Sequence, residues 1–145
     1  MKKILVPTDG SDCSNLAIDM AKDIAVKFDS EIMLLYVNDI TSVENLYSSE
    51  FGTSFTVPDV YRENLEMIAN SILDAGKERI GKGVKVSSVA IQGKPADVII
   101  KYVDNNDVDL VVMGSHGMSG FRRFFVGSVT HKVALSIEKP ILIVR

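Results

Sequence analysis

The sequence is poor in cysteine, with Cys13 as the only thiol in 145 residues. One cysteine cannot build an intrachain disulfide framework, and a chain of this kind fits a reducing compartment, so we expect a cytoplasmic protein. A reactive thiol is the alternative interpretation of Cys13. That chemistry needs a neighbouring base, and the residues beside Cys13 in the sequence supply none.

Long apolar runs are also missing. After the basic start Met1-Lys2-Lys3, the first apolar stretch covers only residues 4–6 before Pro7, which is too short for the core of a signal peptide. No later stretch approaches the about 20 apolar residues of a membrane span. The net charge of −3 gives no general attraction to nucleic acid or acidic membranes. We therefore expect neither kind of partner, and the length fits one domain over residues 1–145.

What the chain does contain is a series of five short runs rich in Val, Ile and Leu. They cover residues 4–6, 32–37, 84–91, 110–113 and 141–144. Continuous apolar runs of this length are typical of strands that are buried on both faces of a parallel sheet.

Between these runs, apolar residues recur at the three- and four-residue spacing of helices. The four predicted stripes are Leu16, Met20, Ala21, Ile24, Ala25 and Phe28; Leu65, Ile68, Ala69, Ile72 and Ala75; Ala96, Ile99, Ile100 and Val103; and Val129, Val133, Ala134 and Ile137. The second helix is expected to begin near Asp59, Pro95 suits the first turn of the third, and the fourth ends before Pro140. This alternation predicts an open α/β sheet with helices on both faces.

The segment 41–58 interrupts the alternation, with Ser, Thr, Asn and Gly among isolated aromatic residues. A connection of this length is either functional or mobile. A mobile surface segment and a contact for a partner both remain open.

A glycine-rich segment connects the fourth predicted strand to the fourth predicted helix. Glycines stand at 114, 117, 120 and 127, followed by Ser128. Without Cβ atoms, such a segment lets backbone N–H groups approach an anion. Ser128 lies at the predicted N-cap, where its hydroxyl and the helix N–H groups could bind phosphate. In the alternative interpretation, the glycines only turn the chain and Ser128 only caps its helix.

Two common nucleotide motifs do not match this segment. A Walker loop requires lysine before its final Ser or Thr, and Gly127 precedes Ser128 here. A dinucleotide fingerprint has Gly-x-Gly-x-x-Gly after the first strand, whereas these glycines follow the fourth.

A second candidate segment follows the first predicted strand, with the sequence Pro7-Thr8-Asp9-Gly10-Ser11. Ser11 is suited to cap the next helix, and Asp9-Gly10 is suited to a turn. A carboxylate beside phosphates is useful when it binds a metal ion or accepts hydrogen bonds from ribose hydroxyls. An ordinary turn aspartate is the alternative role of Asp9.

The whole chain resembles a single-domain universal stress protein. Residues 4–11 are similar to the first strand and turn of that family, and residues 139–145 are similar to its last strand. The family's ATP motif, Gly-x2-Gly-x9-Gly-Ser/Thr, is matched by Gly114, Gly117, Gly127 and Ser128. The resemblance implies a five-stranded parallel sheet of order 3-2-1-4-5, which is Rossmann-like and similar to the adenine nucleotide alpha hydrolases. In that order, Asp9 and Gly114 lie on either side of one crevice, where open α/β sheets bind ligands.

The resemblance also implies roles in an ATP site. Asp9 would hold the ribose, the main chain near Val37 would contact adenine, and Gly117, Gly127 and Ser128 would contact the phosphates. Met113, Gly114, Ser115, His116 and Val129 would lie alongside, with Pro7 and Thr8 beneath the base. Arg122 and Arg123 would either reach the phosphates or stay solvated. Phe124 and Phe125 are bulkier than the aliphatic pair common there, which predicts different packing of that loop.

Three functions follow from this resemblance. The first is an ATP-binding regulator in a stress response, read by an unnamed protein partner. The second is a slow ATPase or nucleotidyl-transfer enzyme, for which His116 is the only nearby candidate base. The third is an interaction module with an empty site.

Whether magnesium or manganese bridges the phosphates stays open. The family's dimers and the apolar edge strand at Ile141–Val144 predict a homodimer through that strand.

Overall fold

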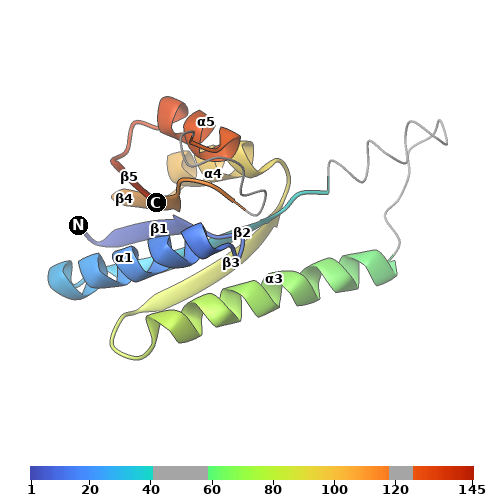
Figure 1. Cartoon of the computed structure of the whole chain (residues 1–145), viewed down its shortest axis with the longest axis horizontal. Helices are drawn as coiled ribbons and strands as arrows, with labels where there is room; N and C mark the ends of the chain where they lie inside the picture. The colour runs from blue at the N-terminus through green and yellow to red at the C-terminus, as the bar shows by residue number, and fades with distance from the viewer. Residues whose placement is uncertain (41–58, 118–125) are drawn as a thin grey trace.

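The computed structural model describes residues 1–40, 59–117 and 126–145. The segment 41–58 and the residues Arg122, Arg123, Phe124 and Phe125 lie outside these ranges. Strands and helices alternate along the described chain (Figure 1). They are β1 (Lys3–Pro7), α1 (Asp12–Phe28), β2 (Glu31–Asn38), α3 (Asp59–Ile80), β3 (Val86–Gln92), α4 (Pro95–Asn105), β4 (Leu110–Gly114), α5 (Ser128–Ser136) and β5 (Ile141–Val144).

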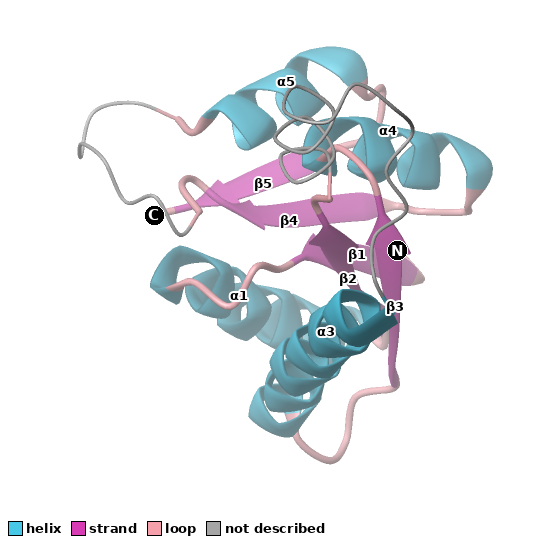
Figure 2. Ribbon diagram, turned by 90° about the vertical axis from the view of Figure 1, so that its right-hand side faces the viewer, coloured by secondary structure: helices cyan, strands magenta, loops and turns pink. Residues whose placement is uncertain are grey.

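The five strands form one parallel sheet with the order β3-β2-β1-β4-β5, which confirms the predicted fold. Helices α1 and α3 cover one face of the sheet, and α4 and α5 cover the other (Figure 2). The chain extends the sheet in one direction from β1 to β3 and then in the other from β4 to β5. The order therefore reverses between β1 and β4, and the carboxyl ends of these two strands are neighbours.

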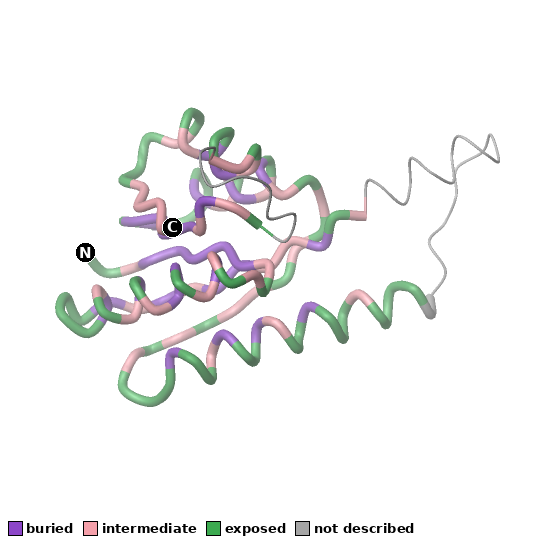
Figure 3. The backbone as a smooth tube through the Cα atoms, in the orientation of Figure 1, coloured by how far each residue is buried: buried purple, intermediate pink, exposed green. Residues whose placement is uncertain are grey.

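The hydrophobic core lies in two layers, one on each face of the sheet. Ile4 and Val6 pack towards α1 and α3, whereas Leu5 packs towards α4 and α5. Residues 4–7 of β1 are buried (Figure 3), with Ile4 and Val6 in one layer of the core and Leu5 in the other. This two-sided burial explains why the strands read as continuous apolar runs rather than alternating ones.

The predicted apolar stripe of α1 is wrong in part. Leu16 and Phe28 are 44% and 59% exposed, and Met20 is also exposed. The predicted residues Ala21 and Ala25 are buried, and Ser14, Ala17 and Ile18 complete the buried face. Small side chains let the helix backbone approach the sheet closely, so steric fit rather than hydrophobicity selects the buried face.

The stripe predicted for α3 needs a similar correction. Ile68 and Ala75 are exposed, and Ala69 and Leu73 carry the contact with the sheet. Gly76 is buried so closely against Leu34 that a Cβ there would lie 2.8 Å from a Leu34 methyl carbon. The stripe of α4 is confirmed, with Ala96, Ile99 and Val103 buried. No helix in the described ranges combines the length and apolar character that crossing a membrane requires.

Candidate functional site

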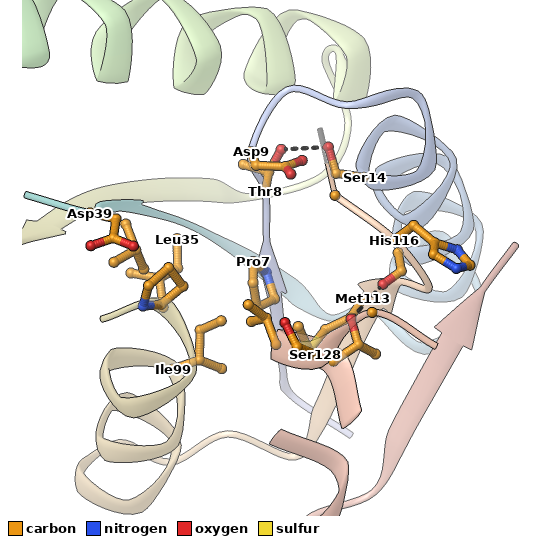
Figure 4. Close-up of a pocket in the computed structure, with 17 residues that line it drawn as sticks. Pro7, Thr8, Asp9, Ser14, Leu35, Asp39, Ile99, Met113, His116 and Ser128 are labelled. Carbon is orange, nitrogen blue, oxygen red and sulfur yellow. Dashed lines mark hydrogen bonds between the residues drawn. The ribbon is translucent and has the colours of Figure 1, made fainter. Parts of the chain in front are cut away.

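A cavity of about 460 Å³ opens at the carboxyl ends of β1 and β4, where the strand order reverses (Figure 4). This is the position at which open α/β sheets bind ligands. Its lining comes from β1, β2, β4, the starts of α1, α4 and α5, and the loops between them. The lining residues are Pro7, Thr8, Asp9, Ser14, Leu35, Val37, Asp39, Pro95, Ile99, Met113, Gly114, His116, Gly117, Gly127, Ser128, Val129 and Thr130. Every predicted site residue except Ser115 is among them.

The turn after β1 fixes Asp9 at the mouth of the cavity. Gly10 has a φ of +80°, which favours glycine and reverses the chain towards α1. Ser11 caps α1 by accepting a hydrogen bond from the Ser14 amide at 3.3 Å, as expected. The Ser11 amide in turn donates to Asp9 Oδ1 at 3.0 Å. The Asp9 carboxylate is thus held by its own turn rather than left to rotate.

The side chains beneath this turn are ordered as well. Thr8 Oγ1 donates to Ser14 Oγ at 3.1 Å (Figure 4). Ser14 Oγ in turn donates to the Ser11 carbonyl at 2.9 Å. The Thr8 amide donates to the Leu35 carbonyl at 2.9 Å, which continues the contact between β1 and β2 into the turn. The first wall of the cavity is therefore a rigid, hydrogen-bonded corner.

The motif glycines form the second wall, and each occupies a tight space. A Cβ on Gly114 would lie 2.8 Å from the Cys13 carbonyl carbon, in the first turn of α1. A Cβ on Gly117 would lie 2.5 Å from Asp9 Oδ2, and one on Gly127 would lie 3.2 Å from the Ser115 carbonyl oxygen. The glycine loop and the Asp9 turn therefore touch each other across the reversal point.

Ser115 differs from the other predicted site residues because it is buried outside the cavity lining. Its amide donates to the Val144 carbonyl at 2.7 Å, and its own carbonyl accepts from the Gly127 amide at 2.7 Å. Its hydroxyl lies 2.9 Å from His116 Nδ1. Ser115 joins the glycine loop to the last strand and to the start of α5.

The start of α5 lies one residue earlier than predicted. Gly127, with extended backbone at φ −59° and ψ 152°, is the N-cap, and Ser128 is the first helical residue. The first helical hydrogen bond runs from the His131 amide to the Gly127 carbonyl at 2.9 Å. The amides of Ser128, Val129 and Thr130 therefore have no acceptor within the helix. All three residues line the cavity, so this helix end presents N–H groups there.

His116, the predicted candidate base, lines the cavity next to Gly117. Its Nε2 atom is buried and has no hydrogen-bond partner in the described part of the chain. In Figure 4 the ring points away from Asp9 and Ser128. The only partner of the ring that the structure gives is the Ser115 hydroxyl at Nδ1.

The opposite end of the cavity is largely apolar. Leu35 of β2 and Ile99 of α4 lie there, with the Asp39 carboxylate beside Leu35 (Figure 4). Pro7, Val37 and Pro95 add further apolar lining. Sequence reasoning identified Pro7 and Val37 but missed six lining residues, which are Ser14, Leu35, Asp39, Pro95, Ile99 and Thr130. Leu35 and Val37 alternate along β2, and Asp39 continues the same period one residue beyond its end, so the two-residue period of a strand could have found Leu35 and Asp39. The approach of α4 is visible only in three dimensions.

The charged side chains in the described lining of the cavity are carboxylates. Asp9 and Asp39 line the cavity, and the lining includes no lysine or arginine from the described ranges. Burial, and then the charge of Asp9, raise the pKa of the nearby Tyr36 above its usual value. The described residues include no group of three or more His, Cys, Asp or Glu side chains placed to hold a metal ion. The site thus offers an apolar end, a carboxylate and a row of N–H groups.

Solved structures share this fold. UspA from Lactobacillus plantarum superposes with a TM-score of 0.79 at 25% identity, covering 99% of this chain and 97% of that one. A universal stress protein solved in complex with cAMP has a TM-score of 0.67 at 23% identity. One from Archaeoglobus fulgidus in complex with dAMP has a TM-score of 0.72 at 19% identity. They cover 99% and 100% of this chain and 96% and 98% of their own.

Sequence comparison gives the same relationship. Universal stress protein MJ0531 of Methanocaldococcus jannaschii is 32% identical over 144 residues, which cover 99% of this chain and 82% of the relative. Universal stress protein YxiE of Bacillus subtilis is 32% identical over 146 residues, covering 99% and 98%. The model of the universal stress protein family matches residues 1–145. The chain therefore belongs to the universal stress protein family.

Proposed function

We propose that this protein binds ATP in the cavity and acts as a nucleotide-dependent regulator in a cytoplasmic stress response. The observation that carries the proposal is the juxtaposition of three features in one cavity. The first-turn amides of α5 lie at one end, apolar side chains lie at the other, and the Asp9 carboxylate lies beside the glycine loop. These features match the phosphates, the base and the ribose of a nucleotide.

The apolar end suits adenine. Leu35, Val37 and Ile99 offer aliphatic surface to a flat ring, and the cavity volume of about 460 Å³ is within the usual range for small-molecule sites. Two proteins of the same fold hold the adenine nucleotides cAMP and dAMP. At 23% and 19% identity, those two structures support the shared fold alone, so the positions proposed for base and ribose rest on the residues that line this cavity.

The phosphates would lie at the start of α5. Its first-turn amides and the positive end of the helix dipole attract anions. Gly117 and Gly127 leave no Cβ in the way of a close approach. Asp9 would accept hydrogen bonds from ribose hydroxyls, because an anionic carboxylate close to phosphates is otherwise repelled.

A divalent cation is compatible with this arrangement. Magnesium in nucleotide sites takes most of its ligands from phosphate oxygens and water, with one or two carboxylates from the protein. Asp9 is the carboxylate beside the glycine loop, and binding the metal ion would be its alternative role to holding the ribose.

Regulation suits the site better than turnover. Phosphoryl transfer to water requires a group that orients the attacking water. The predicted candidate, His116, has its Nδ1 beside the Ser115 hydroxyl and its ring turned away from Asp9 and Ser128. A bound nucleotide that is not consumed can instead set the dimer state or be read by a protein partner.

The purified protein provides the test. After denaturation, the released small molecules are identified by chromatography and mass spectrometry, and added ATP is followed over time with magnesium or manganese. Adenine nucleotide in near-equal molar amount to the chain is expected, with no steady production of ADP. Sustained ADP formation by the wild type that disappears in His116→Ala would support the enzyme instead.

A further inference from the structure

The first turn of α5 is fastened to the end of β4 at two points. The Gly127 amide donates to the Ser115 carbonyl at 2.7 Å. One helical turn further, the Thr130 hydroxyl donates to the Gly114 carbonyl at 2.9 Å. The consecutive carbonyls of Gly114, the last residue of β4, and Ser115 therefore both accept hydrogen bonds from the start of α5.

The Thr130 hydrogen bond is well placed to fix the orientation of the start of α5 relative to β4. Thr130 is only 4% exposed, so water does not compete strongly for the hydrogen bond. Thr130 also lines the cavity together with Ser128 and Val129, the first two residues of α5, whose amides have no acceptor within the helix. Without the hydroxyl, the helix end would keep only the Gly127 contact and could pivot about it.

We propose that Thr130 is a positioning residue that aims the first-turn amides of α5 at the phosphates of a bound nucleotide. The inference rests on the proposed ATP site and assigns to Thr130 the control of phosphate affinity. Because adenine and ribose lie at other parts of the cavity, the contribution of Thr130 should depend on the phosphates and spare the nucleoside.

The test compares the affinities of ATP and adenosine by calorimetric titration. Thr130→Val removes the donor and keeps the side-chain shape, whereas Thr130→Ser keeps the donor. Because Thr130→Val removes one buried hydrogen bond that orients the amides, we expect ATP to bind roughly three- to tenfold more weakly to this variant. Adenosine affinity should stay within about twofold of wild type, and Thr130→Ser should restore ATP binding.

Ser30→Ala is the matched control. Ser30 is buried, and its hydroxyl donates to the Met1 carbonyl at 3.0 Å, beyond the opposite ends of the strands. The Ser30→Ala variant should lose a similar buried hydrogen bond without changing the affinity for ATP or for adenosine. Thermal unfolding of each variant verifies that the fold is retained. If Thr130→Val does not fold, Thr130→Ala, which leaves space instead of a methyl group, is titrated in its place.

The outcomes separate the two proposals. If the wild type binds ATP and Thr130→Val keeps wild-type affinities for both ATP and adenosine, only the role of Thr130 is overturned. An equal loss for both ligands also overturns it, because that result indicates a general structural role. If the wild type binds neither ligand, the proposed function fails, and the role of Thr130 fails with it.

Discussion

The three glycines of the motif are required for three different steric reasons. Gly114 lets β4 approach the backbone of Cys13, Gly117 leaves room for the Asp9 carboxylate, and Gly127 lies against the Ser115 carbonyl. Only Gly117 directly joins the two walls of the cavity. Substitutions at the three positions should therefore affect stability and binding in different proportions.

Gly114→Ala should destabilise the fold. The new Cβ would lie 2.8 Å and 2.9 Å from the carbonyl carbon and oxygen of Cys13, and neither backbone atom can move without shifting α1. Overpacking of this kind costs about 1–3 kcal/mol of unfolding free energy. Urea unfolding measures it, with Gly127→Ala as the comparison because its nearest contact is looser, at 3.2 Å. Equal losses in the two variants would contradict this interpretation.

Gly117→Val should abolish ATP binding while leaving the fold intact. A Cβ at 2.5 Å from Asp9 Oδ2 must displace the carboxylate, and the branched side chain then occupies the cavity. We expect affinity to fall by more than about tenfold, with little change in the unfolding temperature.

A double-mutant cycle tests whether a substitution at Gly117 weakens ATP binding by displacing the Asp9 carboxylate. Gly117→Ala should weaken ATP binding less in an Asp9→Ala background than in the wild type, because the clashing carboxylate is gone. Additive losses would show that Gly117 acts independently of Asp9.

Much of the site was visible in the sequence at the level of residues. All the site residues predicted from the sequence and the family resemblance, except Ser115, line the cavity. They include Asp9, which comes from a segment far from the glycine motif in the sequence. The sequence could not predict that Ser115 lies outside the cavity lining, because its amide pairs with the Val144 carbonyl of another strand. Thr130 was missed because its partner, the Gly114 carbonyl, is a backbone atom without a sequence signal.

At the scale of elements, strands were easier to predict than helix faces. The apolar runs fall within the observed strands apart from the start of β3, where Val84 and Lys85 precede the strand. Helix α1 instead buries alanines and exposes Leu16 and Phe28. The first turn of α1 lies close against Gly114 at Cys13, a contact that no periodicity within α1 encodes.

Helices α1 and α3 are tied by an ion pair with a predictable pH dependence. Arg79 Nε and Nη2 donate to the two carboxylate oxygens of Asp19, both at 2.6 Å. This hydrogen bonding, opposed in part by desolvation, holds the pKa of Asp19 below its usual value of 3.8. The stabilisation is therefore present above that value and is lost as the pH falls through the lowered pKa of the folded state.

Asp19→Asn should accordingly lower stability at about pH 6 and have a much smaller effect near pH 2. Both groups are partly exposed, so the loss should be small and should shrink with added salt. Urea unfolding at the two pH values measures it. Asp23→Asn, at an exposed position on the same helix, is the control. Equal effects of both variants at both pH values would contradict a specific role for the Asp19–Arg79 pair.

For the whole molecule, the sheet leaves two edges, β3 and β5. The Val111 amide donates to the Pro140 carbonyl and the Ser115 amide donates to the Val144 carbonyl. Because backbone groups alternate sides along a strand, the amides of Ile141 and Ile143 face the open edge. This edge can pair with a second copy, so the predicted homodimer through β5 remains our proposal.

Ile143→Pro should convert that homodimer to a monomer. Proline removes an edge donor without removing a β4–β5 hydrogen bond, so the monomer should still fold. Ala90→Pro is the matched control, since the Ile32 amide donates to the Lys85 carbonyl and Ala90 therefore faces the open edge of β3. Sedimentation analysis should give a dimer for Ala90→Pro. A monomeric wild type, or a monomer only for Ala90→Pro, would contradict the β5 interface.

The strand order of the whole sheet came from the family resemblance rather than from the strands themselves. Five apolar runs predict a parallel α/β sheet, but the reversal between β1 and β4 is a property of long-range pairing. That reversal makes the site, because it brings Asp9 beside Gly117 across more than a hundred residues of chain.

The most direct test of the central claim is a calorimetric titration of the nucleotide-free wild-type protein with ATP, in the presence of magnesium or manganese. We predict saturable binding of one ATP per chain with a dissociation constant below the millimolar range, and loss of that binding in Gly117→Val. The absence of binding by either ATP or ADP at millimolar concentration, with a folded protein and either metal present, would contradict the account.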